Sequence, residues 1–170
     1  MIEKCICIGR GGSLRDFDFD IIKNVYKISV NGFHGNPDCI VFIDNGFITS
    51  HPEVYSFRGE IHYGEKSGFV PHSFDHHKIN HRHGARDNNS GFEAVKIALL
   101  KARKVYLIGY DFSPTGYLDT EKVHPCYADT AWIERRVARF RDLPRERIIN
   151  CSPGPLNFFE SIDIKKVFKN

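Results

Sequence analysis

Short hydrophobic runs recur along the chain, and most of them end at Gly, Asn or Asp. We expect six of these runs to form β-strands, at residues 4–8, 26–30, 39–43, 60–63, 104–108 and 147–150. The run at residues 104–108, Lys-Val-Tyr-Leu-Ile, has the continuous apolar character of a central parallel strand. Side chains alternate along a strand, so Cys5 and Cys7 should share one face of the first.

The clearest helix follows a long polar segment and begins near residue 90. We expect Ser90 to be its N-cap, with Glu93 three residues later completing a capping box. A broad apolar stripe between Phe92 and Leu100 would face the core. Shorter or weaker helices are expected at residues 16–24, 52–57, 129–141 and 163–168.

Strands that alternate with helices predict an α/β fold with a parallel sheet and right-handed crossovers. We therefore expect one domain, residues 1–170, with a Rossmann-like parallel sheet, helices on both faces and a mobile lid loop. Ligands of such sheets bind outside the carboxyl ends of the strands. The loops that follow the strands are consequently the places to look for a site.

The composition of the chain mainly excludes some classes of protein. The formal net charge of +3 is too small to suggest a dedicated nucleic-acid binder. Apolar runs are far too short to span a membrane, and the first residues lack the layout of a signal peptide, so we expect a cytoplasmic protein. The five cysteines have no CxxC spacing and are expected to be reduced core residues. A homo-oligomer is compatible with these features.

A glycine-rich turn, Gly9-Arg10-Gly11-Gly12-Ser13, follows the first expected strand. Glycines there would let backbone N–H groups approach a phosphate or ribose, and the Ser13 hydroxyl would add a donor. The turn matches neither GxGxxG nor a P-loop, and it could also be a plain turn.

Three further strand-end or helix-start positions could face the same ligand. Asn31 ends the second strand, and Asn89-Ser90-Gly91 opens the strong helix, where free N–H groups suit an anion or a cap. Asp111 ends the strand at 104–108 and would bind a sugar hydroxyl or cap the next turn.

Residues 67–89 form a long polar segment without a clear period, which is typical of functional loops. It holds His77, His81 and His83, which are candidate ligands for a divalent metal. Basic neighbours favour a lid over an anionic substrate instead, so we expect no metal. His124, in the polar loop after Asp111, is a candidate general base because its pKa lies near working pH.

Several of these short sequence segments resemble segments of bacterial lipooligosaccharide sialyltransferases and of their small phage-encoded relatives. The opening Gly9-Arg-Gly-Gly-Ser-Leu resembles the family's G-N-G-P-S-L, and Val30-Asn31 resembles its second strand end. The block from Ser90 to Phe112 is the most specific match, resembling S-G…A…A-L…I-Y-L-x-G-x-D-F. The ending Ile149-Asn-Cys-Ser-Pro resembles the family's last strand and tail.

This resemblance implies a Rossmann-like fold and transfer of a sugar from a cytidine-monophosphate donor, without a required cofactor or metal. By position, His124 would be the base and Tyr117 a tyrosine beside the leaving phosphate. The nucleotide would be held by the residues already singled out: Gly9, Gly11, Ser13, Asn31, Asn89, Ser90, Gly91 and Asp111. We therefore expect an enzyme, a glycosyltransferase with an acceptor that the sequence does not identify, in a bacterial host cell if the chain is phage-encoded.

Two alternatives stay open. The same pattern resembles archaeal pterin diphosphokinases, in which ATP with Mg²⁺ is bound and Asp44, Asp111 and Asp119 would be the carboxylates that matter. The third reading is a nucleotide-binding or virion-associated protein that performs no chemistry. Dependence on Mg²⁺ and on His124 would separate the three.

Overall fold

The structure is a computed structural model of the chain, and it describes residues 1–168 except 44, 65–66, 70–75, 80–88 and 113–128. All strands of the described part belong to one sheet, and every neighbouring pair is parallel. The strands are β1 (Ile2–Ile8), β2 (Tyr26–Val30), β3 (Cys39–Phe42), β4 (Glu60–Gly64), β5 (His76–Ile79), β6 (Ala102–Ile108), β7 (Ile148–Asn150) and β8 (Glu160–Ser161).

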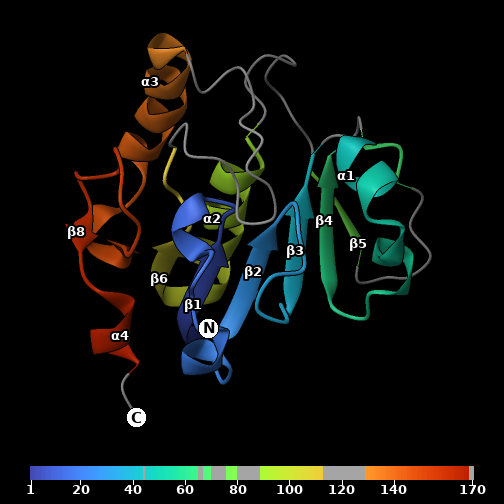
Figure 1. Cartoon of the computed structure of the whole chain (residues 1–170), viewed down its shortest axis with the longest axis horizontal. Helices are drawn as coiled ribbons and strands as arrows, with labels where there is room; N and C mark the ends of the chain where they lie inside the picture. The colour runs from blue at the N-terminus through green and yellow to red at the C-terminus, as the bar shows by residue number, and fades with distance from the viewer. Residues whose placement is uncertain (44, 65–66, 70–75, 80–88, 113–128, 169–170) are drawn as a thin grey trace.

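The strand order is β5-β4-β3-β2-β1-β6-β7-β8. The chain first adds strands on one side of β1, as far as β5, and then returns to place β6 on the other side (Figure 1). The direction of winding therefore reverses between β1 and β6. In the register of this pair, Ile8 lies opposite Ile108, so both strands end at the same level.

Helices cover both faces of the sheet, so the expected Rossmann-like α/β fold is confirmed (Figure 1). The α-helices are α1 (Asn45–Ser50), α2 (Ser90–Lys101), α3 (Thr130–Ala138) and α4 (Ile164–Val167). The 3-10 helices are η1 (Gly12–Leu14), η2 (Phe19–Ile22), η3 (Pro52–Ser56), η6 (Arg139–Asp142) and η7 (Arg145–Arg147).

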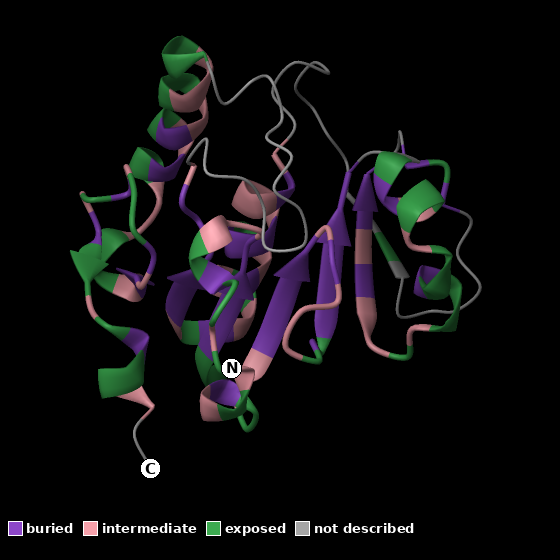
Figure 2. Cartoon of the chain, viewed as in Figure 1, coloured by how far each residue is buried: buried purple, intermediate pink, exposed green. Residues whose placement is uncertain are grey.

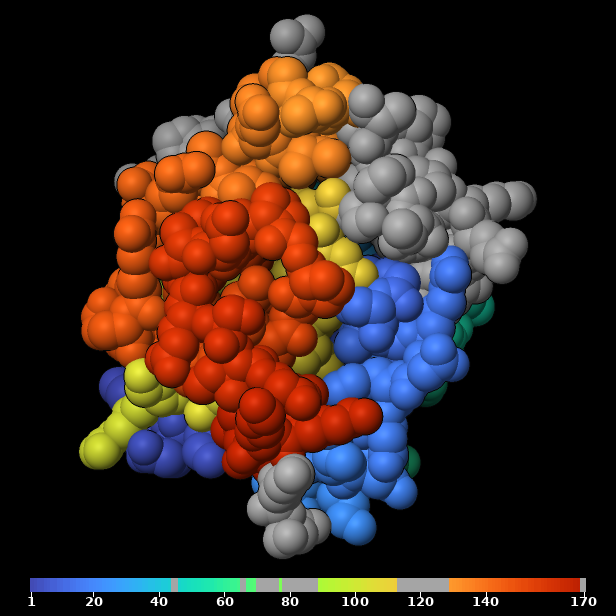
Figure 3. Space-filling model, turned by 60° about the vertical axis from the view of Figure 1, so that its left-hand side comes forward, coloured from blue at the N-terminus to red at the C-terminus, as the bar shows by residue number. Residues whose placement is uncertain are grey.

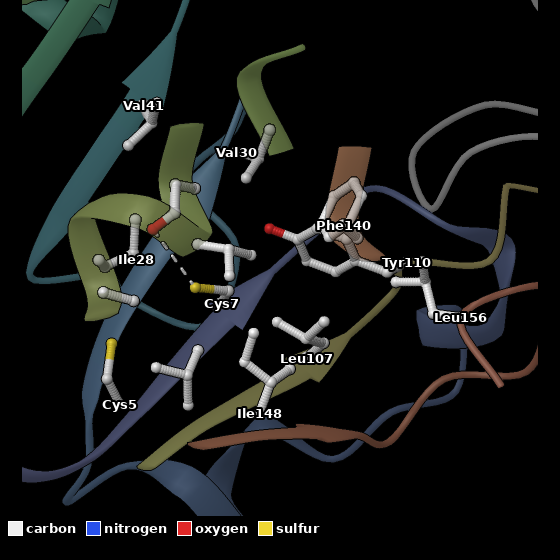
Figure 4. Close-up of a cluster of buried hydrophobic side chains, with 14 of the residues drawn as sticks. Cys5, Cys7, Ile28, Val30, Val41, Leu107, Tyr110, Phe140, Ile148 and Leu156 are labelled. Carbon is white, nitrogen blue, oxygen red and sulfur yellow. Dashed lines mark hydrogen bonds between the residues drawn. The ribbon is translucent and has the colours of Figure 1, made fainter. Parts of the chain in front are cut away.

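One face of the sheet packs against α2, α3 and η6. Cys5 and Cys7 point to this side, as their spacing predicts, and Tyr110 and Phe140 close the cluster at the carboxyl ends of the strands (Figure 4). The Cys7 thiol donates a weak hydrogen bond to the Ala94 carbonyl of α2 at 3.7 Å. Both cysteines are fully buried, and the four described cysteines form no disulfide.

The opposite face carries two apolar clusters. Ile6 and Ile8 of β1 pack with residues of η1, η2 and α4, and the strands β3 and β4 pack with α1 and η3. Figure 2 shows the central strands as the most continuously buried part of the molecule. In Figure 3 the orange and red C-terminal segment covers much of the visible face, beside blue N-terminal residues. Ile22 of η2 and Ile164 of α4 belong to the same apolar cluster.

The structure confirms the six expected strands, with ends shifted by up to two residues, and corrects other expectations. Residues 76–79 form β5 within the segment expected to be a loop, and α1 and β8 were not expected at all. These elements are short and polar or irregular in pattern, so hydrophobic periodicity gives no signal for them. The helix expected at 129–141 ends as an α-helix at Ala138 and continues as η6.

The N-cap of α2 is Asn89 and not Ser90. The Asn89 side chain accepts hydrogen bonds from the N–H groups of Gly91 (3.0 Å) and Phe92 (3.3 Å). Glu93 pairs with Lys96 at 2.9 Å, so the expected capping box is not formed. Asn and Ser are almost equally good N-caps, and sequence alone could not choose between neighbours.

Candidate functional site

The carboxyl ends of the strands bring most of the predicted site residues to one edge of the sheet. The glycine turn leaves β1, Asn31 leaves β2, and Asp111 follows β6. The N-terminus of α2 also lies at this edge, because the Tyr110 hydroxyl reaches the Gly91 carbonyl. The arrangement lies at the point where the direction of winding reverses, the usual ligand position in an open parallel sheet.

The glycine turn lies directly against the end of β6. The N–H of Gly9 donates to Ile108 and the N–H of Gly11 donates to Gly109, both at 2.8 Å. A Cβ atom on Gly9 would lie 2.3 Å from the Gly109 carbonyl oxygen, so no larger residue fits without backbone movement. The glycines therefore allow two loops to approach, and two of the N–H groups expected to face a phosphate are used internally.

Asp111 and Ser13 join these two loops. The Ser13 N–H donates to Oδ2 of Asp111 at 2.8 Å, and the Ser13 hydroxyl donates to Oδ1 at 2.6 Å. A Cβ on Gly11 would lie 2.4 Å from the Asp111 carboxyl, so the glycine makes room for this contact. Only 5% of Asp111 is exposed, and two donors to a carboxylate stabilise its charge there. Asp111 thus holds the turn in place, a role that the sequence did not suggest.

Tyr110 extends the same junction to two other segments. Its N–H donates to the Ser152 hydroxyl oxygen at 2.9 Å, and its own hydroxyl donates to the Gly91 carbonyl at 3.1 Å. Burial raises the pKa of Tyr110 well above its usual range, so the hydroxyl stays a donor. Sequence reasoning missed Tyr110 and Ser152 as site-forming residues, although both lie in strand-end loops.

Asn31 combines two features that are unusual for a residue with a side chain. Its φ is +49°, in the left-handed region, and its side-chain Oδ1 is buried without a hydrogen-bond partner among the described residues. Phe112, next to Asp111, also has a positive φ, +48°. Strained backbone of this kind often occurs at binding sites, and an unpaired buried acceptor is costly unless a ligand or water supplies a donor.

The N-terminus of α2 is only partly available to an anion. Asn89 occupies the N–H groups of Gly91 and Phe92, as described above. Ser90 is 8% exposed, so its hydroxyl lies close to the protein interior. Capping explains Asn89 fully, and the dipole of α2 still favours negative charge at this edge.

The two predicted catalytic residues, Tyr117 and His124, lie outside the described residues, as do His81, His83, Asp44 and Asp119. Most of the segment expected to form the lid is also outside them. His77 is described and lies on β5, the outermost strand beyond β4. It is considered below with its neighbours.

No model of a protein family matches the chain, and no curated protein or solved structure is detectably similar to it. No helix in the described part is long and apolar enough to cross a membrane. The class that the structure defines is a Rossmann-like α/β domain in which the direction of winding reverses between β1 and β6.

Proposed function

We propose that the chain binds a nucleotide-activated sugar at the carboxyl edge between β1 and β6 and transfers its glycosyl group to an acceptor. The observation that carries the proposal is the convergence of the glycine turn, Asn31 and the start of α2 at the point where the winding reverses. Ligands of open parallel sheets bind in this crevice. The unpaired Oδ1 of Asn31 supports a ligand donor, such as a ribose hydroxyl or a base amino group.

The residues at this edge have separate roles in the proposal. Asn31 contacts the nucleoside, and Ser90 with the positive end of α2 favours the phosphate. Gly9, Gly11, Ser13 and Asp111 act indirectly, since they fix the position of the turn. The resemblance to lipooligosaccharide sialyltransferases supports a cytidine-monophosphate leaving group.

The same resemblance supports the chemistry. His124 takes the proton from an acceptor hydroxyl while the oxygen attacks the anomeric carbon of the sugar. The bond from that carbon to the phosphate oxygen breaks, and Tyr117 donates a hydrogen bond to the departing phosphate, which stabilises its developing charge. The products are the glycosylated acceptor and cytidine monophosphate, with the proton on His124.

The test is release of cytidine monophosphate from CMP-sialic acid by the purified chain, with and without Mg²⁺. Metal-independent release that is lost in both His124→Ala and Tyr117→Phe supports the proposal. His51→Ala is the matched control, because His51 pairs with exposed Glu53 at 3.0 Å. Release of cytidine monophosphate that is unchanged in both variants would contradict the mechanism. Turnover only with ATP and Mg²⁺ would indicate diphosphoryl transfer instead.

A further inference from the structure

A second group of reactive side chains lies where β3 and β4 begin, a region that we call the amino edge. Cys39 begins β3, Glu60 begins β4, and the two pair directly in the parallel register. His62 is two residues along β4, on the same face as Glu60, and pairs with His77 of β5. One ligand atom from each of Cys39, Glu60 and His62 lies within 4.8 Å of the other two.

The two oxygens of Glu60 face different partners. Oε1 lies 2.6 Å from Nε2 of His62 and 3.7 Å from Nε2 of His77. Oε2 lies 2.7 Å from the Lys101 ammonium at the end of α2 and 3.1 Å from the Tyr26 hydroxyl. One oxygen is thus directed at the histidines, and the other is held by two donors.

The thiol of Cys39 and the rings of His62 and His77 come from the neighbouring strands β3, β4 and β5. The rings of His62 and His77 stack with centroids 4.8 Å apart, and their side chains are 14% and 51% exposed. Cys39 is fully buried, so His77 is the most exposed of the four side chains.

Burial has opposite consequences for two of these groups. It raises the pKa of the Cys39 thiol well above its usual range, and the nearby Glu60 acts in the same direction. It lowers the pKa of His62, although the short contact with Glu60 acts in the opposite direction.

We propose that Cys39, Glu60, His62 and His77 bind a Zn²⁺ ion at the amino edge of the sheet. One thiolate, two imidazoles and one carboxylate are the donor types that zinc takes, usually four at a time. Zinc bonds of about 2.0–2.3 Å place tetrahedral ligand atoms roughly 3.3–3.8 Å apart. The 3.7 Å between His77 and Glu60 already fits, and His62 must move slightly away from Glu60.

Binding displaces protons. The Cys39 thiol releases its proton to water as the Sγ–Zn²⁺ bond forms. The proton between Nε2 of His62 and Oε1 of Glu60 moves to Nδ1 of His62, and two metal bonds replace that hydrogen bond. Lys101 and Tyr26 remain on Oε2 and orient the carboxylate, as outer partners commonly do. The ion joins β3, β4 and β5, and its site is separate from the proposed nucleotide edge.

The test is a titration of the purified full-length chain with Co²⁺, a spectroscopic substitute for Zn²⁺. The proposal predicts visible absorption typical of four-coordinate cobalt, a sulfur-to-cobalt band in the near ultraviolet, proton release, and displacement by Zn²⁺. Cys39→Ser should abolish the sulfur band. Cys151→Ser is the matched control, because Cys151 packs in the cluster on the other face, and it should leave the band unchanged.

His77→Ala covers the case in which Cys39→Ser does not fold, because the His77 side chain is half exposed. It should weaken Zn²⁺ binding by more than about tenfold, the loss that even outer partners cause at zinc sites. His51→Ala should not change the affinity. A cobalt complex without the sulfur band, or equal Zn²⁺ affinity in wild type and His77→Ala, would overturn the site. Neither result depends on nucleotide binding or transfer.

Discussion

The carboxyl edge and the amino edge each hold a poorly exposed carboxylate, but the two carboxylates have different hydrogen-bond and ion-pair partners. Asp111, at the carboxyl edge, accepts both of its described hydrogen bonds from the neutral groups of one residue, Ser13. Glu60, at the amino edge, is shared by Lys101, His62, His77 and the hydroxyl of Tyr26. One carboxylate fixes a loop, and the other is the centre of a group whose charges can change.

Because of this difference, we expect the two edges to respond to different substitutions and solution conditions. The carboxyl edge depends on close packing of glycine loops, so it should respond to added side-chain volume and to loss of the Asp111 contacts. The amino edge depends on ionisation, so it should respond to pH and to cations. Substitutions and solution conditions can therefore separate the two.

The largest effect is expected from Gly9→Ala. Its Cβ would lie 2.3 Å from the Gly109 carbonyl oxygen, and backbone cannot move away without breaking the β1–β6 junction. We expect a loss of about 3 kcal/mol in the free energy of unfolding, the upper range of overpacking effects. Urea unfolding measures it. Gly91→Ala is the control. Its Cβ would meet the Tyr110 ring at 3.1 Å and Oδ1 of Asn89 at 3.2 Å, which are side-chain atoms and not backbone, so its cost should be under about 1 kcal/mol.

The next effect is expected from Asp111→Ala. It removes both hydrogen bonds from Ser13 to a charged carboxylate and leaves the Ser13 N–H without its acceptor, which should cost about 2–3 kcal/mol in urea unfolding. Ser13→Ala removes only the hydroxyl contact and should cost about 1 kcal/mol. The double variant should be no worse than Asp111→Ala alone, because both act through one contact. Additive losses would contradict the junction described here.

A smaller effect separates the two candidate caps of α2. Asn89→Ala removes the acceptor of two N–H groups and should cost about 1 kcal/mol, whereas Ser90→Ala, which leaves both capping bonds in place, should cost less. Thermal or urea unfolding of the pair decides the matter. The reverse order of stabilities would restore Ser90 as the cap.

The smallest effect is a pH dependence from the amino edge. Burial lowers the pKa of His62 below its ordinary value of 6.5, so the unfolded chain binds a proton there before the folded chain does. Stability from this group is present above pH 6.5 and is lost as the pH falls through the folded pKa. Without added metal, the melting temperature of wild type should therefore fall more than that of His62→Gln between about pH 7 and pH 5.

Glu60 contributes at lower pH. Burial alone would raise its pKa, but hydrogen bonds from Lys101 and His62 outweigh burial and hold the pKa below its ordinary value of 4.5. This stability is present above pH 4.5 and is lost as the pH falls through the lower, folded value. The melting temperature of wild type should therefore fall more steeply with decreasing pH below 4.5 than that of Glu60→Gln. Equal slopes of melting temperature against pH would contradict this assignment.

The sequence predicts the central sheet well because its strands are continuous apolar runs. Parallel geometry then brings the glycine turn, Asn31 and Asp111 to one edge without further information. The short elements α1, β5 and β8 carry no periodic signal, and the choice between Asn89 and Ser90 depends on backbone angles at the helix start. The hydrogen bonds between Ser13 and Asp111 were also not predicted, because 98 residues separate the two in the sequence.

The amino edge was missed for a related reason. Cys39, Glu60 and Lys101 are distant in sequence and meet only through the register of β3 with β4 and the point at which α2 ends. The histidines singled out from sequence included His77 but none of its partners. Spacing along the chain could not reveal a site that three parallel strands assemble.

The central claim, nucleotide binding at the carboxyl edge, is tested most directly by thermal shift with cytidine, uridine, guanosine and adenosine nucleotides and CMP-sialic acid, each with and without Mg²⁺. A nucleotide at a hundred times its dissociation constant adds about 2.7 kcal/mol of stability. We predict stabilisation by cytidine monophosphate or CMP-sialic acid without Mg²⁺, reduced in Asn31→Gly, which keeps the left-handed backbone and removes only the side chain. No shift with any nucleotide, or the same shift in Asn31→Gly, would contradict the account.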